Sequence, residues 1–184
     1  MNTWRGSTRR SWQFTVDSWQ LSFQLGVSVP VSIRAAASGD REFVLDLAER
    51  LVSFDVPSWR EKPELVEGDR RALAQWFAEA RSAKADEALF IAELDGTPAG
   101  CAFLVTLVDY FNERPHAHLS VLAVAAGAEG KGVGSALLDR SVAWAKERQS
   151  DRLTLSALVT NARARSLYER KGFSGEYIRY VLPL

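Results

Sequence analysis

A glycine-rich segment, Glu129-Gly130-Lys131-Gly132-Val133-Gly134, constrains the fold of this chain more than any other feature. A strand-like apolar stretch over 119–124 precedes it, and an amphipathic helical pattern over 133–149 follows it. Glycines at alternate positions let the backbone pass close to a ligand, because no Cβ stands in the way. The start of the following helix presents free N–H groups and the positive end of its dipole to the same point. This unit of strand, loop and helix predicts a site for a phosphate or pyrophosphate group.

The length and composition indicate one globular domain with a buried core. The chain has 184 residues, of which 47% are hydrophobic and 25% are charged. Its 23 basic side chains equal its 23 acidic ones, so no basic field attracts nucleic acid. No apolar stretch approaches the roughly 20 residues of a membrane span. We therefore expect neither nucleic acid nor a membrane as a partner.

Cysteine and histidine are scarce. Cys101 is the only cysteine, which excludes a disulfide framework within one chain and indicates a reducing, cytoplasmic setting. Its apolar surroundings predict a core residue rather than a nucleophile. With His116 and His118 as the only histidines, we expect no metal site.

Residues 1–30 differ from the rest of the chain and are expected to form an N-terminal extension, either an edge strand or a disordered arm. The run Thr8–Trp12 resembles a twin-arginine export signal, but Asp17, Gln20 and Gln24 interrupt the apolar segment that export requires. The main domain is expected over residues 31–184.

Hydrophobic periodicity predicts elements in the order β-α-α-β-β-β-α-β-α-β. Strands are expected at 31–35, 89–94, 99–107, 117–124, 153–158 and 177–182, and helices at 41–53, 69–83, 133–149 and 162–171. A helix cap is expected at Asp40, a loop over 54–68 and a hairpin turn at Asp95-Gly96. A three-strand meander followed by a crossover helix gives a mixed, mostly antiparallel central sheet with helices on both faces, a three-layer α+β fold.

Two common glycine-loop chemistries do not fit the spacing. A dinucleotide fold needs G-x-G-x-x-G after its first strand, whereas this chain has G-x-G-x-G after a meander. A P-loop needs a hydroxyl residue directly after Lys131, where Gly132 stands. The remaining option is the loop that holds the pyrophosphate of coenzyme A.

At this point the sequence resembles a known family. From about Val31 to Leu184 the chain is similar to the GNAT superfamily of N-acetyltransferases. Its loop signature, Q/R-x-x-G-x-G/A, is matched by Glu129–Gly134 in every position but the first. A second block, Asn161–Phe173, resembles the pattern N-x-x-A-x-x-L-Y-x-x-x-G-F. A helix and a strand separate the two blocks, and together they are far more specific than either one alone.

The resemblance implies an acetyl-CoA-dependent enzyme that transfers an acetyl group directly to a primary amine of a small molecule or peptide. It also implies a bulged strand whose backbone bonds the pantetheine arm, and loop amides that hold the pyrophosphate. The residues expected to bind acetyl-CoA are Leu122, Ala123, Val124, Glu129, Gly130, Lys131, Gly132, Val133, Gly134, Ser135, Asn161 and Tyr168. Two alternatives stay open, a non-catalytic acyl-CoA-binding module and a nucleotide-binding domain.

The resemblance also implies catalytic roles. Tyr168 is expected to protonate the departing thiolate, since a phenol donates a proton without carrying charge into an apolar tunnel. Many family members place a carboxylate where this chain has Ser120-Val121, so another base is needed. His118 is the expected base, because strand alternation puts it on the face of Ser120, opposite Leu119 and Val121. Glu93 or a chain of water molecules is the alternative.

Glu129 replaces the family's usual Gln or Arg and is expected to point to solvent. Arg163 and Arg165 are placed where either could offset its charge. The acceptor pocket is expected from the first two helices, from the loop with Asp55 and Trp59, and from the loop with Tyr110 and Phe111. Such aromatic and acidic residues suit a cationic amine. The final strand over 177–182 is apolar enough to join a homodimer interface.

Overall fold

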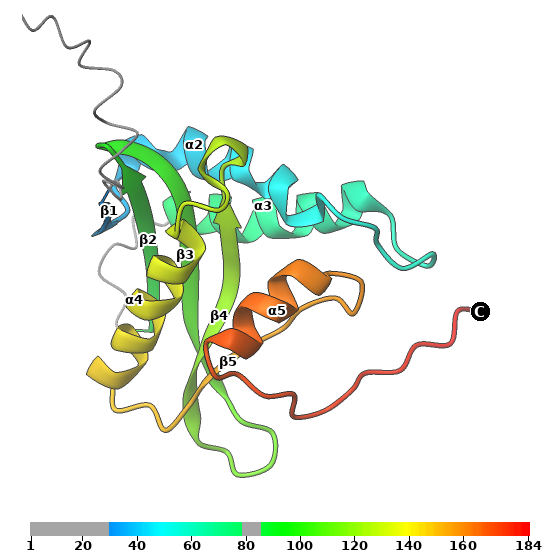
Figure 1. The fold of residues 1–184 in the computed structure, drawn as a ribbon. Coiled ribbons are helices and arrows are strands. Elements are labelled where there is room, and N and C mark those ends of the chain that lie inside the picture. The colour runs from blue at the N-terminus through cyan, green and yellow to red at the C-terminus, as the bar shows by residue number, and fades with distance from the viewer. Residues whose placement is uncertain (1–29, 79–85) are drawn as a thin grey trace, which may run out of the picture.

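The computed structural model of the protein describes residues 30–78 and 86–184. Five strands form one sheet in the order β1-β2-β3-β4-β5 (Figure 1). These strands are β1 Val31–Ala35, β2 Glu87–Leu94, β3 Thr97–Val108, β4 Pro115–Val124 and β5 Leu153–Leu155. Strands β1 to β4 pair with one another in antiparallel fashion, and β5 runs parallel to β4. The extension expected over residues 1–30 lies outside the described residues except for Pro30.

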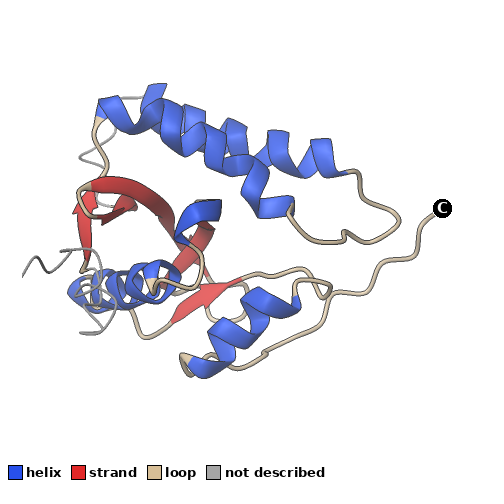
Figure 2. Ribbon diagram, turned by 45° about the horizontal axis from the view of Figure 1, so that its top comes forward, coloured by secondary structure: helices blue, strands red, loops and turns tan. Residues whose placement is uncertain are grey.

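Helices cover both faces of this sheet, which confirms the three-layer prediction (Figure 2). The helices are α2 Arg41–Asp46, α3 Lys62–Ala78, α4 Val133–Glu147 and α5 Ala162–Arg170, with short 3₁₀ helices η1 Ser38–Asp40, η2 Leu47–Val52 and η3 Ala126–Ala128. The elements α2, η2 and α3 lie on one face, while α4 and α5 lie on the other. In the described part of the chain, no helix has the length and apolar character needed to cross a bilayer.

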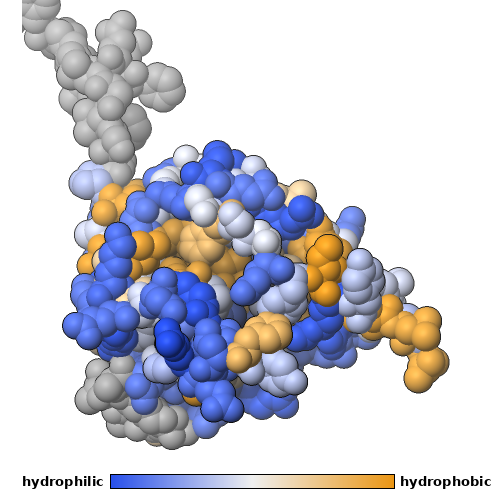
Figure 3. All heavy atoms as spheres, turned by 90° about the horizontal axis from the view of Figure 1, so that it is seen from below, coloured by the Kyte–Doolittle hydropathy of each residue, from blue (hydrophilic) through white to orange (hydrophobic). Residues whose placement is uncertain are grey.

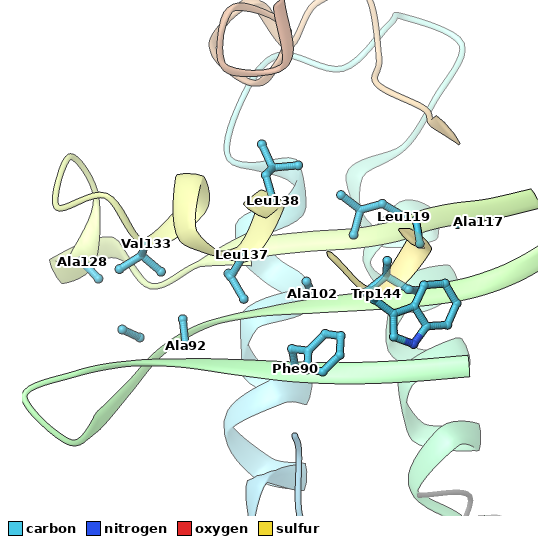
Figure 4. Close-up of a cluster of buried hydrophobic side chains, with 13 residues drawn as sticks. Phe90, Ala92, Ala102, Ala117, Leu119, Ala128, Val133, Leu137, Leu138 and Trp144 are labelled. Atoms are coloured by element: carbon cyan, nitrogen blue, oxygen red, sulfur yellow. The ribbon is translucent and has the colours of Figure 1, made fainter. Parts of the chain in front are cut away.

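Two hydrophobic clusters form the core, one on each face of the sheet. On the α4 face, Val133, Leu137 and Trp144 pack against Phe90 and Ala92 of β2 (Figure 4). On the opposite face, the cluster joins α2, η2 and α3 to the sheet through Val44, Leu47, Leu73, Ile91, Cys101 and Val121. Cys101 is fully buried, as predicted, and burial raises the pKa of its thiol to about 12. The thiol is therefore neutral and part of the packing.

A β-bulge in β4 changes which residues share a face. The register with β3 shifts between Phe103 and Leu104, which pair with Val121 and Leu119, so that Ser120 is the extra residue. Leu119 belongs to the cluster on the α4 face, while Val121 belongs to the cluster on the other face. The prediction that Leu119 and Val121 lie on one face is therefore wrong, because it assumed regular alternation.

Strands β4 and β5 stay together for only three residue pairs. Ala117, His118 and Leu119 pair with Leu153, Thr154 and Leu155, where β5 ends. The strand predicted over 153–158 is therefore shorter than expected. Because β4 continues to Val124, the backbone groups of 120–124 on this side have no partner strand among the described residues. They are available to a ligand.

Three helix predictions require correction. Helix α3 begins at Lys62 instead of Asp69, since Pro63 is well suited to the first turn of a helix. The region 41–53 is α-helical only to Asp46 and continues as a 3₁₀ helix. Asp40 does not cap α2; its carboxylate accepts the backbone N–H of Ala37 and pairs with Arg34.

The final strand predicted over 177–182 is wrong. Residues 171–184 have no regular secondary structure, and Tyr177, Ile178 and Leu182 are exposed. The C-terminal segment leaves the body of the molecule (Figure 1), and the view from below shows hydrophobic residues on a projecting segment (Figure 3). A strand needs an edge of adequate length for its hydrogen bonds, and β5 offers only three residues.

Candidate active site

A cavity of about 730 Å³ lies where β4 and β5 diverge. Its walls come from η2 and α3 on one side and from α5 on the other, with β4 and the glycine loop between them. In Figure 1 the helices of the two sides lie one above the other beside β4, with α3 above and α5 below. A cavity of this size falls within the range of small-molecule and cofactor sites.

The wall formed by β4 is the unpaired part of that strand. Leu122, Ala123 and Val124 all line the cavity, together with Ser120 of the bulge. Their backbone N–H and C=O groups on this edge can bond an extended ligand in the way a neighbouring strand would. The structure therefore brings the three predicted strand residues to the site.

The glycine loop follows directly and ends in the first turn of α4. Gly130 and Gly132 have φ of +74° and +83°, a backbone conformation that L side chains rarely adopt. Gly132 precedes α4 and gives it no side-chain cap, so the first N–H groups of the helix stay open to a ligand. Glu129, Gly130, Gly132, Val133, Gly134 and Ser135 all line the cavity, whereas Lys131 is exposed and does not. Open N–H groups at the start of a helix are an arrangement that favours an anion.

Glu129 does not point to solvent, contrary to the prediction. One carboxylate oxygen of Glu129 accepts a hydrogen bond from the guanidinium group of Arg50 at 2.5 Å, and the other accepts one from Arg163 at 2.7 Å. Both arginines line the cavity, and their hydrogen bonds, that of Arg163 first, lower the pKa of Glu129. Arg165 instead donates to the carbonyl of Val159. The sequence did not single out Arg50, because it lies far from Glu129 along the chain.

Two residues of the second sequence block reach the cavity from α5. Asn161 caps the helix, since its side-chain oxygen accepts the N–H of Ala164 at 3.1 Å, and it also lines the cavity. Tyr168 lines the same cavity, with its ring beside that of Phe173. Burial raises the pKa of Tyr168 above its ordinary value of about 10. Its phenol is therefore protonated at neutral pH and able to donate.

His118 lies just outside this lining. Its Nδ1 is 2.8 Å from the hydroxyl of Thr154, at the point where β4 and β5 pair. Burial first, and then the charge of His116, lower the pKa of His118, so its imidazole is neutral at pH 7. The carboxylate of Glu93, the alternative base, accepts a hydrogen bond from Arg34 at 2.6 Å. Glu93 lies in β2, which is separated from β4 by β3.

The α3 side supplies the remaining wall. Leu65 and Asp69 of α3 line the cavity with Phe54, whereas Asp55 and Trp59 do not. Tyr110 and Phe111 are 90% and 80% exposed in the loop between β3 and β4, and they do not line it either. The first two helices thus contribute as expected, but the four named loop residues do not. Asp69 was missed as a site residue.

The fold and this site define a class of protein: a mixed-sheet α+β domain in which a glycine loop and the start of a helix line a cavity between two diverging strands. The chain belongs to the acetyltransferase (GNAT) family, whose model matches residues 48–173. The sequence resemblance is therefore confirmed. The match therefore identifies this part of the chain as a domain of that family.

Individual relatives agree with this assignment. The chain is 35% identical over 134 residues to a mycothiol acetyltransferase of Propionibacterium freudenreichii subsp. shermanii, covering 70% of this chain and 40% of that protein. The chain spans less than half the length of the curated relatives that it matches.

Solved structures share the fold. A putative acetyl transferase from Pyrococcus furiosus is 19% identical with a TM-score of 0.61, covering 84% of this chain and 100% of that one. A predicted acetyltransferase from Clostridium acetobutylicum, solved with acetyl-CoA, is 21% identical with a TM-score of 0.59, covering 84% and 96%.

Proposed function

We propose that the protein is an acetyl-CoA-dependent N-acetyltransferase that moves an acetyl group directly to a primary amine of a small molecule or peptide. One observation carries this proposal: a single cavity contains the glycine loop, the unpaired edge of β4 and Tyr168. The relative named mycothiol acetyltransferase supports a small-molecule acceptor.

The donor would be held along the middle of the cavity. The N–H groups of Gly130–Ser135 bind the pyrophosphate, where the loop and the α4 dipole favour negative charge. The backbone of Leu122–Val124 bonds the pantetheine arm and polarises the thioester carbonyl. Asn161 adds a side-chain amide to the same arm.

In the transfer step, the acceptor nitrogen attacks the thioester carbonyl carbon. An N–C bond forms, the C–S bond breaks, and the thiolate takes the phenolic proton of Tyr168. The proton that the nitrogen loses as the amide forms returns through water to the phenolate, which restores Tyr168. Holding the amine beside the thioester makes the step effectively unimolecular. The raised pKa of Tyr168 supports this role, because the group has to be protonated at the start.

The proton of the acceptor ammonium goes to His118 in this proposal. A water molecule has to relay it, because His118 does not line the cavity. The neutral imidazole favoured by its lowered pKa supports the role of base. The proposed setting is a reducing cytoplasm, in keeping with the single buried thiol.

The test is an acceptor screen with acetyl-CoA against polyamines, aminoglycosides, amino acids and peptides. We expect turnover with at least one class of amine. Saturable acetyl-CoA binding without turnover over the whole panel would favour the acyl-CoA-binding module. Thermal protection by ATP or NAD instead of coenzyme A would favour the nucleotide-binding domain.

Tyr168→Phe tests the chemistry. We expect turnover to fall by about 10²-fold while the affinity for coenzyme A stays nearly unchanged, because only the proton donor is lost. Tyr110→Phe is the matched control, since Tyr110 is exposed and does not line the cavity. Steady-state kinetics and calorimetric titration provide the two readouts. Unchanged turnover in Tyr168→Phe would remove this residue from the mechanism.

A further inference from the structure

The charged side chains that line the cavity differ in whether they have a hydrogen-bond or ion-pair partner. They are Arg50, Asp69, Glu129, Arg163, Arg170 and Lys171. Glu129 binds both Arg50 and Arg163, Lys171 binds Asp139 at 2.7 Å, and Arg170 donates to the hydroxyl of Ser166. Asp69 has no hydrogen bond or ion pair within residues 30–78 and 86–184. The negative charge left for a ligand on this lining is therefore that of Asp69.

The position of Asp69 within α3 is unusual for a carboxylate. Leu65, Asp69, Leu73 and Trp76 follow one another at helical spacing, so Asp69 interrupts the apolar stripe of the helix. Leu73 and Trp76 are buried in the core, and Leu65 lines the cavity beside Asp69. Burial accordingly raises the pKa of the carboxyl group. A charge in such a place destabilises the fold unless a partner of opposite sign arrives.

We propose that Asp69 binds a positively charged group of the acceptor, separate from the amine that reacts, so that the preferred acceptors are diamines, polyamines or amino sugars. The inference rests on the proposed acetyl transfer, with Asp69 on the α3 wall and Tyr168 on the α5 wall of one cavity. An ammonium group bonded to a carboxylate out of bulk water forms a charge-assisted hydrogen bond. Phe54 on the same wall supplies an aromatic surface that a cation also favours.

The test compares diaminoalkanes with monoamines of the same chain length. Their dissociation constants are measured by calorimetry with coenzyme A present, for the parent protein, Asp69→Asn and Glu67→Gln. Glu67 is the matched control, because it is an exposed carboxylate of α3 outside the cavity lining. Thermal unfolding establishes that each variant is folded.

We expect the parent protein and Glu67→Gln to bind the diamine about 10- to 100-fold more tightly than the monoamine, in line with hydrogen bonds to charged groups. Asp69→Asn should lose this preference by weaker diamine binding, with monoamine binding unchanged. In turnover assays the same loss should fall on KM, with kcat retained.

Equal binding of the two amines by the parent protein would overturn the proposal. So would a preference retained in Asp69→Asn, or a loss of kcat with both amines, which would make Asp69 a proton acceptor instead. Turnover separates this proposal from the proposed function. A diamine preference that depends on Asp69, without acetylation of any amine, would reject acetyl transfer and keep the cation site.

Discussion

Asp40 and Asp69 show how a partner decides the role of a carboxylate. Asp40 is buried and receives two hydrogen bonds of 2.7 Å from Arg34, which lower the pKa of its carboxyl group. Asp69 is half-buried, lacks such a partner in the described part of the chain, and its pKa is raised. Asp40 therefore stabilises the fold at neutral pH, whereas the charge of Asp69 destabilises it until a ligand binds. This contrast is the reason to place Asp69 in the site.

At the residue scale, His118→Ala tests the base. The folded-state pKa of His118 is lowered, so the neutral, active form persists to a pH below the ordinary histidine value of about 6.5. We expect kcat/KM of the parent to fall on the acid side through that lowered pKa. In His118→Ala this fall of kcat/KM at acid pH should disappear, and the maximal rate should drop by about 10²-fold.

His116→Gln is the companion variant for this measurement. This substitution removes the positive charge of His116, which should raise the pKa of His118. The fall of kcat/KM on the acid side should then move to higher pH, with the maximal rate retained. A pH–rate profile of His118→Ala that coincides with that of the parent would exclude His118 as base.

At the element scale, the start of α4 depends on a backbone conformation. Gly132 has φ of +83° immediately before the first helical residue, Val133, and a Cβ there would meet no other atom. The requirement for glycine is therefore conformational, and steric crowding has no part in it. The loop and helix can present their N–H groups to a phosphate only while this turn is intact.

Gly132→Ala should lower the free energy of unfolding by about 1 kcal/mol, because alanine is strained in this conformation. It should also weaken coenzyme A binding. Gly127→Ala is the control: Gly127 lies in η3 without a positive φ, and its Cβ would also meet open space. Urea unfolding and calorimetric titration provide the measurements. Equal losses in both variants would contradict this account of the turn.

The family resemblance implied a bulge in the strand before the glycine loop, but the residue pattern alone did not locate it at Ser120. Motif spacing located the loop, Asn161 and Tyr168, because these contacts depend on residues close together in the chain. The bulge at Ser120 depends on the register with β3, which no local pattern records. The start of α3 was missed because Pro63 was taken for a loop residue rather than a first-turn residue.

At the scale of the whole molecule, contacts between distant segments were the hardest to predict. Glu129 pairs with Arg50 and Arg163, and charge alone does not choose among the many arginines of the chain. Asp69 carried a usable signal, a carboxylate on the apolar side of a helix, but the signal becomes clear only once the boundaries of α3 are known.

The C-terminal segment exposes hydrophobic and aromatic side chains that could form an oligomer interface. Tyr177, Ile178, Tyr180, Leu182 and Leu184 are all exposed, a concentration of apolar surface typical of an interaction site. We predict a homodimer formed through this segment, measured by light scattering after gel filtration. Removal of residues 175–184 should give a monomer, whereas serine at Tyr110 and Phe111 should leave the dimer intact. A parent protein of monomeric mass would contradict the prediction.

The carboxylate of Glu129 also has a mechanical consequence. Arg50 belongs to η2 and Arg163 to α5, so one side chain ties together two segments that face each other across the cavity. These segments cannot move apart at this point without losing at least one ion pair. Dissolved ions screen such partly exposed ion pairs. The two walls of the cavity should therefore separate more readily as ionic strength rises. The residue that departs from the family's loop signature thus couples the motions of the two walls.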